Sequence, residues 1–288
     1  MIEKYYSGVI EQIYNRIGKE TRNIVMANYS NDFSIENLEV IRRYQSNEDN
    51  VFFAYSEFSY NTLVGAYEPF LDIICNMHRR FIGGSFDDFQ KECGVYYLHR
   101  QVLNSYYETG ECFREETVLL NEVAYEQRRM TMAIADMLKR LSEVRPLMIV
   151  INRFQMASKS SIETIKYLID NPCANIGIVL GVNAIVKGAD STVEVWDRIV
   201  ESLEDRSAIY YIGSAGPLKN NIKTTNDDEL YITMNFEQSI QEASNIMEFL
   251  DYEQARRGCR IIEHKIKFEN AWIDEKSLRR FYLVYART

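Results

Sequence analysis

Five short, continuously apolar runs divide the first 212 residues of this 288-residue chain, and the segments between them carry apolar residues at helical spacing. A strand that is apolar along its whole length is buried on both faces, which is typical of a parallel sheet covered by helices on each side. We therefore expect an α/β fold with a five-stranded parallel sheet flanked by helices. The expected strands span residues 23–27, 50–55, 147–151, 176–181 and 208–212.

The spacing of the apolar residues also predicts the intervening helices. Gly18 is placed to end the first helix, and Pro69 to begin another. Gly83 and Gly84 interrupt a segment between residues 82 and 112 that we expect to be helical in pieces. The stretch of residues 66–74 looks like a helix that is entered just after Pro69, and the other expected helices span residues 5–17, 35–45, 115–143, 162–169 and 191–204.

Beyond a polar linker at residues 221–229 the pattern contains helix alone. We expect residues 1–221 to form the α/β domain and residues 230–288 a separate segment of three helices, each with one apolar face. A lone helical repeat cannot bury its own hydrophobic side. The three faces should therefore pack together away from the sheet and leave an apolar face exposed near residue 288. We also expect the chain to be part of a larger protein.

The composition excludes some partners. Apolar residues make up 46% of the chain and aromatic residues 12%, which is typical of a globular protein. The net charge is −9, and residues 237–288 contain nine acidic and nine basic residues, so the whole excess of acidic residues precedes them. Because a surface that coats nucleic acid is basic, we expect no direct nucleic-acid binding by this segment.

The five cysteines are scattered and odd in number, without a C-x-x-C pair, which indicates reduced thiols in a cytoplasmic protein. The apolar runs are far shorter than a membrane span, and the polar amino terminus differs from a signal peptide, so we expect no membrane association. The spacing of Cys75 and His78, and of Cys93, His99 and Cys112, does not suggest a zinc site or a catalytic Cys–His pair.

The first expected strand leads through a polar turn into a helix, which is the layout of a phosphate-binding loop. A working loop reads G-x-x-x-x-G-K-[ST], in which backbone N–H groups and the Lys hold the phosphates and the hydroxyl holds Mg²⁺. On this template the glycines become Asn28 and Phe33, the Lys becomes Ser34, and the Mg²⁺ ligand becomes Ile35. Asp32 adds a negative charge where a triphosphate would lie.

The polar residues of this turn have two interpretations. Asn28, Ser30 and Asn31 could donate hydrogen bonds to an anion at the helix N-terminus, where the backbone N–H groups and the helix dipole favour negative charge. Asn and Ser are also the residues that commonly cap a helix, and we favour this second interpretation.

In a second segment too, an apolar strand leads through a polar turn into a helix. The strand ends in Asn152 and Arg153, and a serine-rich turn opens the helix. Residues 146–158, PLMIVINRFQMAS, resemble the Walker B region of the signal-transduction ATPases with numerous domains, in which two acidic residues end the strand. Asn183, at the end of the fourth expected strand, looks like the polar sensor residue of these ATPases. Residues 67–70, YEPF, match the block that opens the helix after their second strand.

The resemblance covers residues 5–213 in the correct order and implies an AAA-like P-loop NTPase fold. In that fold the first strand lies between the fifth and the fourth, with the third and the second beyond. The helical segment, in which residues 252–255 (YEQA) begin a helix, looks like the start of the tetratricopeptide-type array that often follows this ATPase module.

Hydrolysis of a nucleoside triphosphate requires a Mg²⁺ held by a hydroxyl and an acidic strand end, a Lys on the phosphates, and a group that orients water. Four of these groups are replaced here, so we expect no catalytic residue, no bound cofactor and no metal. ATP would bind only in the alternative in which Arg153 supplies the missing positive charge. The degenerate nucleotide-site positions are Asn28, Ser30, Asn31, Ser34, Asn152, Arg153 and Asn183.

The resemblance then implies a non-catalytic pseudo-ATPase: a regulatory or scaffolding module of a larger bacterial signalling or transcription-regulating protein. It would act through protein partners or other domains of the same polypeptide. Two alternatives stay open. One is an ATP-binding signalling ATPase with a rebuilt nucleotide site, and the other is the N-terminal part of a tetratricopeptide-containing transcriptional activator or cyclic-dinucleotide signalling protein.

Overall fold

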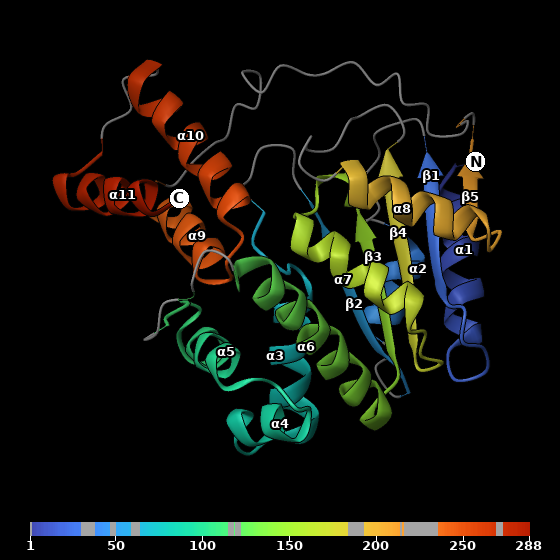
Figure 1. Ribbon diagram of the computed structural model, residues 1–288. Coiled ribbons are helices and arrows are strands. Elements are labelled where there is room, and N and C mark those ends of the chain that lie inside the picture. Colours follow the sequence, from blue (N-terminus) through green and yellow to red (C-terminus); the bar gives the residue numbers. More distant parts are fainter. Residues whose placement is uncertain are drawn as a thin grey trace.

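A computed structural model describes residues 2–29, 38–46, 50–58, 64–114, 118, 122–183, 193–213, 215, 236–268 and 273–288. Its centre is a five-stranded, all-parallel sheet in the order β2-β3-β4-β1-β5 (Figure 1). The predicted α/β fold is confirmed, and so is the predicted position of the first strand between the fifth and the fourth. The strands are β1 (Ile24–Tyr29), β2 (Phe52–Glu57), β3 (Leu147–Asn152), β4 (Ile176–Asn183) and β5 (Ile209–Ile212).

Helices connect the strands and continue beyond β5. In chain order they are α1 (Ile2–Arg16), α2 (Glu39–Ser46), α3 (Phe70–Met77), the π-helix η1 (His78–Ile82), α4 (Phe86–Glu92), α5 (Tyr97–Thr109), α6 (Val123–Val144), the 3-10 turn η3 (Phe154–Met156), α7 (Lys159–Asp170), α8 (Val193–Glu204), α9 (Phe236–Glu248), α10 (Tyr252–Phe268) and α11 (Glu275–Arg287).

The sheet is covered on both faces, as its apolar strands require. Every residue of β3 and β4 is buried. Successive side chains of a strand point to opposite faces, so Val25 and Ala27 pack on the side of α1 and α2, whereas Met26 packs on the side of α6, α7 and α8 (Figure 1). The sheet and its helices therefore form three layers around two apolar cores.

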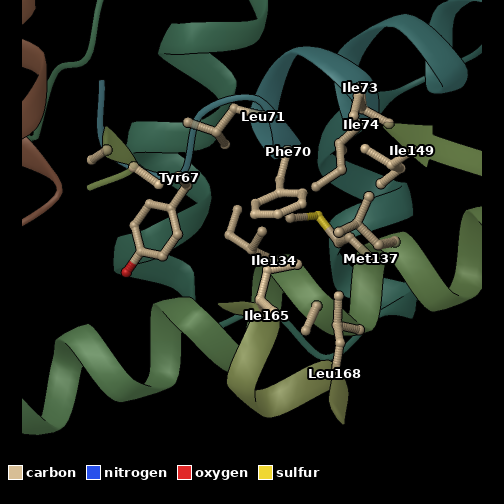
Figure 2. Close-up of a cluster of buried hydrophobic side chains, with 14 of the residues drawn as sticks. Tyr67, Phe70, Leu71, Ile73, Ile74, Ile134, Met137, Ile149, Ile165 and Leu168 are labelled. Carbon is tan, nitrogen blue, oxygen red and sulfur yellow. The ribbon is translucent and has the colours of Figure 1, made fainter. Parts of the chain in front are cut away.

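The larger core lies between the sheet and helices α3, α6 and α7. Phe70 is fully buried there and lies among Ile74, Ile134 and Met137, with Ile149 of β3 close by (Figure 2). The start of α3 therefore attaches the segment after β2 to the long helix α6.

The segment after α3 is helical in short pieces, as predicted. Gly83 ends the π-helix η1 with a φ of 69°, and Gly84 follows with a φ of 73°, a left-handed conformation that glycine adopts without a steric penalty. Ser85 then caps α4 by accepting a hydrogen bond from the Asp88 N–H at 3.2 Å. The predicted entry of a helix just after Pro69 is confirmed, since α3 begins at Phe70 and Pro69 occupies the cap position. Tyr67, shortly before it, has a φ of 60°.

The last three helices pack on one another, as predicted. Their shared core contains fully buried Phe281 of α11, together with Ile240 of α9 and Ile262 of α10, and no strand contributes to it within the described residues. The side chains of Tyr282 and Leu283 are exposed on α11, at 53% and 67%. The predicted linker at residues 221–229 lies outside the described residues, so the division into two domains and the tetratricopeptide character stay predictions.

The end of α9 nevertheless joins the helical segment to the sheet domain. Ile246 and Met247 are buried in the larger core. Asn245 Oδ1 accepts a hydrogen bond from the Cys112 N–H at 3.0 Å, and Gln254 Nε2 donates one to the Val64 carbonyl at 3.4 Å. The helices α9 and α10 are therefore attached to the body of the protein by both apolar and polar contacts.

The core between α3, α6 and α7 gives a direct test of this packing. Ile134→Ala should lower the free energy of unfolding by about 2–5 kcal/mol, because the removed groups leave a cavity in a fully buried site. Met132→Ala on the same helix, where the side chain is 37% exposed, should cost less than about 1 kcal/mol. Urea denaturation followed by circular dichroism measures both, and equal losses would contradict this description of the core.

Candidate functional site

The described candidates all lie at the carboxyl edge of the sheet, which is where ligands bind in open parallel sheets. Asn28, Asn152 and Asn183 end or nearly end β1, β3 and β4, and Arg153 follows β3 directly. The predicted positions Ser30, Asn31 and Ser34 lie outside the described residues, as do Asp32, Phe33 and Ile35.

The register of the strands divides these candidates between the two faces. Asn28 is two residues after Met26 and so points to the face of α6–α8, whereas Tyr29 points to the face of α1 and α2. Asn152 and Asn183 share that second face, since Asn152 alternates with Val150 and Asn183 pairs with Tyr29. The structure therefore brings Asn152 and Asn183 to one side of the sheet and places Asn28 on the other.

A buried hydrogen bond joins two of the strand ends. The Tyr29 hydroxyl donates to Asn152 Oδ1 at 2.6 Å, and both side chains are fully buried. Tyr6 of α1 packs edge-to-face on Tyr29, with the ring centroids 6.3 Å apart. Within the described part of the chain, Asn152 Nδ2 has no acceptor. This strand end therefore consists of neutral side chains that are bonded to each other and closed off from solvent.

Gly181 of β4 permits this arrangement. A Cβ atom at this position would lie 2.8 Å from Asn152 Oδ1 and closer still to the Tyr6 hydroxyl. Only glycine therefore leaves room for the two polar side chains. Burial, and then the neighbouring hydroxyl of Tyr29, raises the pKa of Tyr6 well above its ordinary value, so its hydroxyl is neutral at physiological pH.

Arg153 is bound to a carboxylate at the next strand end. Its backbone is left-handed, with a φ of 55°, and its Nη1 lies 3.0 Å from Glu57 Oε1. Both side chains are only 19% exposed, and the Tyr55 hydroxyl also donates to Glu57. The positive charge of Arg153 is thus neutralised by a side chain of the adjacent strand β2.

The turn after β3 reaches the third strand end. Gln155, in η3, accepts a hydrogen bond from the Asn183 backbone N–H at 3.3 Å through its Oε1 atom. Side chains therefore link the strand ends of β1, β2, β3 and β4. Sequence reasoning missed Tyr6, Tyr29 and Glu57 in this network. Tyr6 has the helical spacing of a core residue, and only the strand order places Glu57 beside Arg153.

Residues 67–70 contact the serine-rich start of the helix that follows β3. The Ser161 hydroxyl donates to the Glu68 carbonyl at 2.8 Å, and Ser160 Oγ accepts a hydrogen bond from the Tyr67 N–H at 3.0 Å. Ser158 caps α7 through the Ser161 N–H. These residues join the start of α3 to the start of α7, which is a structural role.

Three carboxylates gather where α3 meets α9. A Cβ placed on Gly65 would lie 3.3 Å from Glu68 Oε2 and 3.6 Å from Glu242 Oε2, so both oxygens lie beside Gly65. Asp72 lies one turn after Glu68 and accepts a hydrogen bond from the Tyr106 hydroxyl at 2.8 Å. Burial, then the charges of Glu68 and Asp72, raises the pKa of Glu242 to about 7. No basic side chain within the described residues forms an ion pair with any of the three.

The cysteines and histidines provide no site within the described residues, where no group of three or more His, Cys, Asp or Glu side chains is placed to hold a metal ion. None of the five cysteines forms a disulfide. Burial raises the pKa of the Cys75 thiol to about 12, which leaves it protonated at neutral pH. His99 Nε2 lies 2.9 Å from Glu126 Oε2, but burial and then Arg114 lower the pKa of His99 to about 3.

Comparison of the sequence with protein-family models and with curated proteins finds no match. Among the described helices, none combines the length and the apolar character that crossing a membrane requires.

The hydrogen bond between Tyr29 and Asn152 can be tested by mutation. Tyr29→Phe should lower the free energy of unfolding by about 1–3 kcal/mol, because it leaves the Asn152 Oδ1 atom buried without its donor. The double variant Tyr29→Phe/Asn152→Leu should recover part of this loss, since both polar partners are then replaced. Tyr282→Phe, at an exposed hydroxyl, is the control for urea denaturation. A loss no larger than that of the control would mean that the bond contributes nothing.

The raised pKa of Glu242 predicts a pH dependence. The carboxyl group is protonated in the folded protein up to about pH 7, but in the unfolded chain it ionises near its ordinary pKa of about 4.3. The unfolded state therefore binds fewer protons between these values, and stability falls as the pH rises through this window. Glu242→Gln should raise the melting temperature at pH 8 and change it little at pH 4. Glu237→Gln, exposed on the same helix, is the control, and a pH-independent effect of Glu242→Gln would contradict the assignment.

Proposed function

We propose that this chain is a catalytically inactive relative of the P-loop ATPases that serves as a regulatory or scaffolding module through protein interaction. The observation that carries the proposal is the buried hydrogen bond between Tyr29 and Asn152 at the carboxyl edge of the sheet. In a working ATPase of this architecture, the end of the third strand faces Mg²⁺ and water, and it must be accessible to both.

The chemistry of this strand end supports the proposal. Mg²⁺ prefers charged and hydrated oxygen ligands in an octahedral arrangement. Asn152 offers a neutral amide oxygen that already accepts a hydrogen bond, and the fully buried ring of Tyr29 lies against it. A metal here would have to displace Tyr29 and break the packing with Tyr6. Loss of an acidic metal ligand and of the general base leaves a phosphoryl group without positioning or charge stabilisation.

The position of Arg153 weakens the rebuilt-site alternative. A substitute for the missing Lys would have to extend toward the loop after β1, whereas the Arg153 guanidinium lies against Glu57 on the opposite side of β3 from β4. Recruiting Arg153 to a phosphate would leave Glu57 with its partner lost in a half-buried site, at a cost in free energy. We therefore assign Arg153 a structural role at the edge of the sheet.

A regulatory role through protein contacts agrees with the rest of the chain. The helical segment α9–α11 is attached to the sheet domain through its first two helices, whereas Tyr282 and Leu283 on α11 are exposed. Exposed aromatic and aliphatic side chains on one helix are typical of a surface that a partner or a further helix covers. We propose that the module belongs to a larger bacterial signalling or transcription-regulating protein in which this surface is used.

Nucleotide binding is the direct test. Millimolar ATP, GTP or ADP with Mg²⁺ should not raise the melting temperature, whereas a ligand at a hundred times its dissociation constant would stabilise the folded state by about 2.7 kcal/mol. Differential scanning fluorimetry of the wild type and of Arg153→Ala measures this. A clear upward shift that Arg153→Ala abolishes would favour the rebuilt-site ATPase, and Lys139→Ala on α6 is the control for a non-specific loss of charge.

A further inference from the structure

A cavity of about 190 Å³ lies at the amino edge of the sheet, opposite the strand ends that the arrowheads mark in Figure 1. It is lined by residues that begin β1 and β5 and by residues at the C-terminal ends of α1, α7 and α8. Pockets that hold drug-sized ligands measure about 300–1,000 Å³. This cavity therefore suits a smaller ligand, of the size of a simple metabolite.

The lining of the cavity is positively charged, although the protein as a whole is acidic. Arg16, Arg22 and Arg206 line it together with one carboxylate, Glu20, which gives the lining a net charge of +2 in a chain of net charge −9. A phosphate group carries a charge of about −1.5 to −2 at pH 7, and guanidinium groups bind it through paired N–H donors. The charge of the cavity therefore favours a phosphate group over a cation or a neutral ligand.

Only part of this positive charge is used by the fold. Arg206 Nη1 donates to the Ile169 carbonyl at 2.7 Å, near the end of α7. Arg16 Nε lies 3.7 Å from Glu20 Oε2. A guanidinium group has five N–H donors, so both arginines keep donors for a ligand. Arg22 is exposed and forms neither a hydrogen bond nor an ion pair with the part of the chain that the structure describes.

A buried acceptor in the lining lacks a donor. Asn23, directly before β1, is fully buried, and its Nδ2 donates to the carbonyls of Glu20 at 2.6 Å and Ala174 at 3.2 Å. These bonds fix the amide, and its Oδ1 atom accepts no hydrogen bond within the described residues. An unpaired buried acceptor costs free energy, which a ligand with a hydroxyl group would recover. Ser207, also in the lining, has a φ of 51°, a strained conformation that is typical of ligand sites.

We propose that this cavity binds a small phosphate-bearing molecule that also carries a hydroxyl donor. The guanidinium groups of Arg22 and Arg206 would hold the phosphate, and the hydroxyl would donate to Asn23 Oδ1. Two sources share this chemistry: hydrogen phosphate, whose own P–OH is the donor, and a phosphate monoester of a polyol, which has a separate hydroxyl. Because the cavity lies at the opposite end of the sheet from the nucleotide-site positions, the inference goes beyond the proposed function and does not rest on it.

Isothermal titration calorimetry of the full chain at pH 8 tests the class of ligand. Glycerol 3-phosphate should bind saturably at one site per chain, and n-propyl phosphate, which lacks the hydroxyl groups, at least about tenfold more weakly. Inorganic phosphate should likewise bind at least about tenfold more tightly than sulfate, which has a similar shape and charge but no O–H donor.

The order of these affinities identifies the source of the phosphate. Tighter binding of glycerol 3-phosphate than of inorganic phosphate assigns the cavity to an ester, and the reverse order assigns it to free phosphate. No saturable binding of either compound overturns the proposal. Equal binding within the pair that contains the tighter ligand also overturns it, because the hydroxyl then makes no contact with Asn23. This role is measured through the ligands rather than by substitution, since the Asn23 amide also bonds two carbonyls of the fold.

Arg22 provides variants that leave the fold undisturbed, because it has no partner among the described residues. Arg22→Gln should weaken the tighter ligand about tenfold, and Arg22→Glu, which reduces the net charge of the lining to zero, should weaken it further. Arg128→Gln and Arg128→Glu, exposed on α6 and outside the lining, are the matched controls and should bind like the wild type. Circular dichroism verifies that each variant is folded. If the Arg22 variants bind like these controls, the phosphate binds elsewhere and the proposal is wrong.

The same variants separate a failure of this inference from a failure of the proposed function. A rise in melting temperature with ATP that Arg153→Ala abolishes concerns the carboxyl edge, and it removes the proposed function whatever the cavity binds. Absent binding of phosphate and of glycerol 3-phosphate, with no stabilisation by nucleotide, removes only the cavity.

Discussion

The burial of the three central strands is the constraint on which the rest of the structure depends. β3 and β4 are buried at every residue, and β1 at all but its first. Such strands are stable only if helices cover both faces of the sheet, so α1 and α2 must lie on one side and α6, α7 and α8 on the other. Right-handed crossovers then leave few strand orders for a chain of this length.

The same constraint explains which parts of the fold could be predicted from the sequence. Apolar runs and helical spacing are local signals, and they identified all five strands and the long helix α6. Pro69 likewise marked the start of α3, whereas only the backbone shows that Tyr67, two residues before it, has a positive φ. The order of the strands came from the family resemblance, since no local pattern contains it.

The site was less accessible to sequence reasoning, because it depends on contacts between distant strands. Asn152 and Asn183 were found from their positions at strand ends. Their neighbours Tyr6 and Tyr29 were not found. From the sequence alone, a Tyr on the apolar face of a helix or at the end of a buried strand cannot be distinguished from a core residue. The role of Gly181 likewise follows only from the structure, in which a side chain at this position would displace Tyr6 and Asn152.

The polar residues at the carboxyl edge of the sheet are stabilised mainly by contacts with one another. Strand ends that face a bound ligand carry charges that the ligand compensates, and without the ligand those charges repel each other or remain unpaired in a partly buried site. Here the end of β3 carries a neutral amide bonded to Tyr29, and the single positive charge beside it is paired with Glu57. The carboxylates of Glu68 and Asp72, which form no ion pair among the described residues, lie beside β2 instead. The described strand ends are therefore held together by contacts among their own side chains.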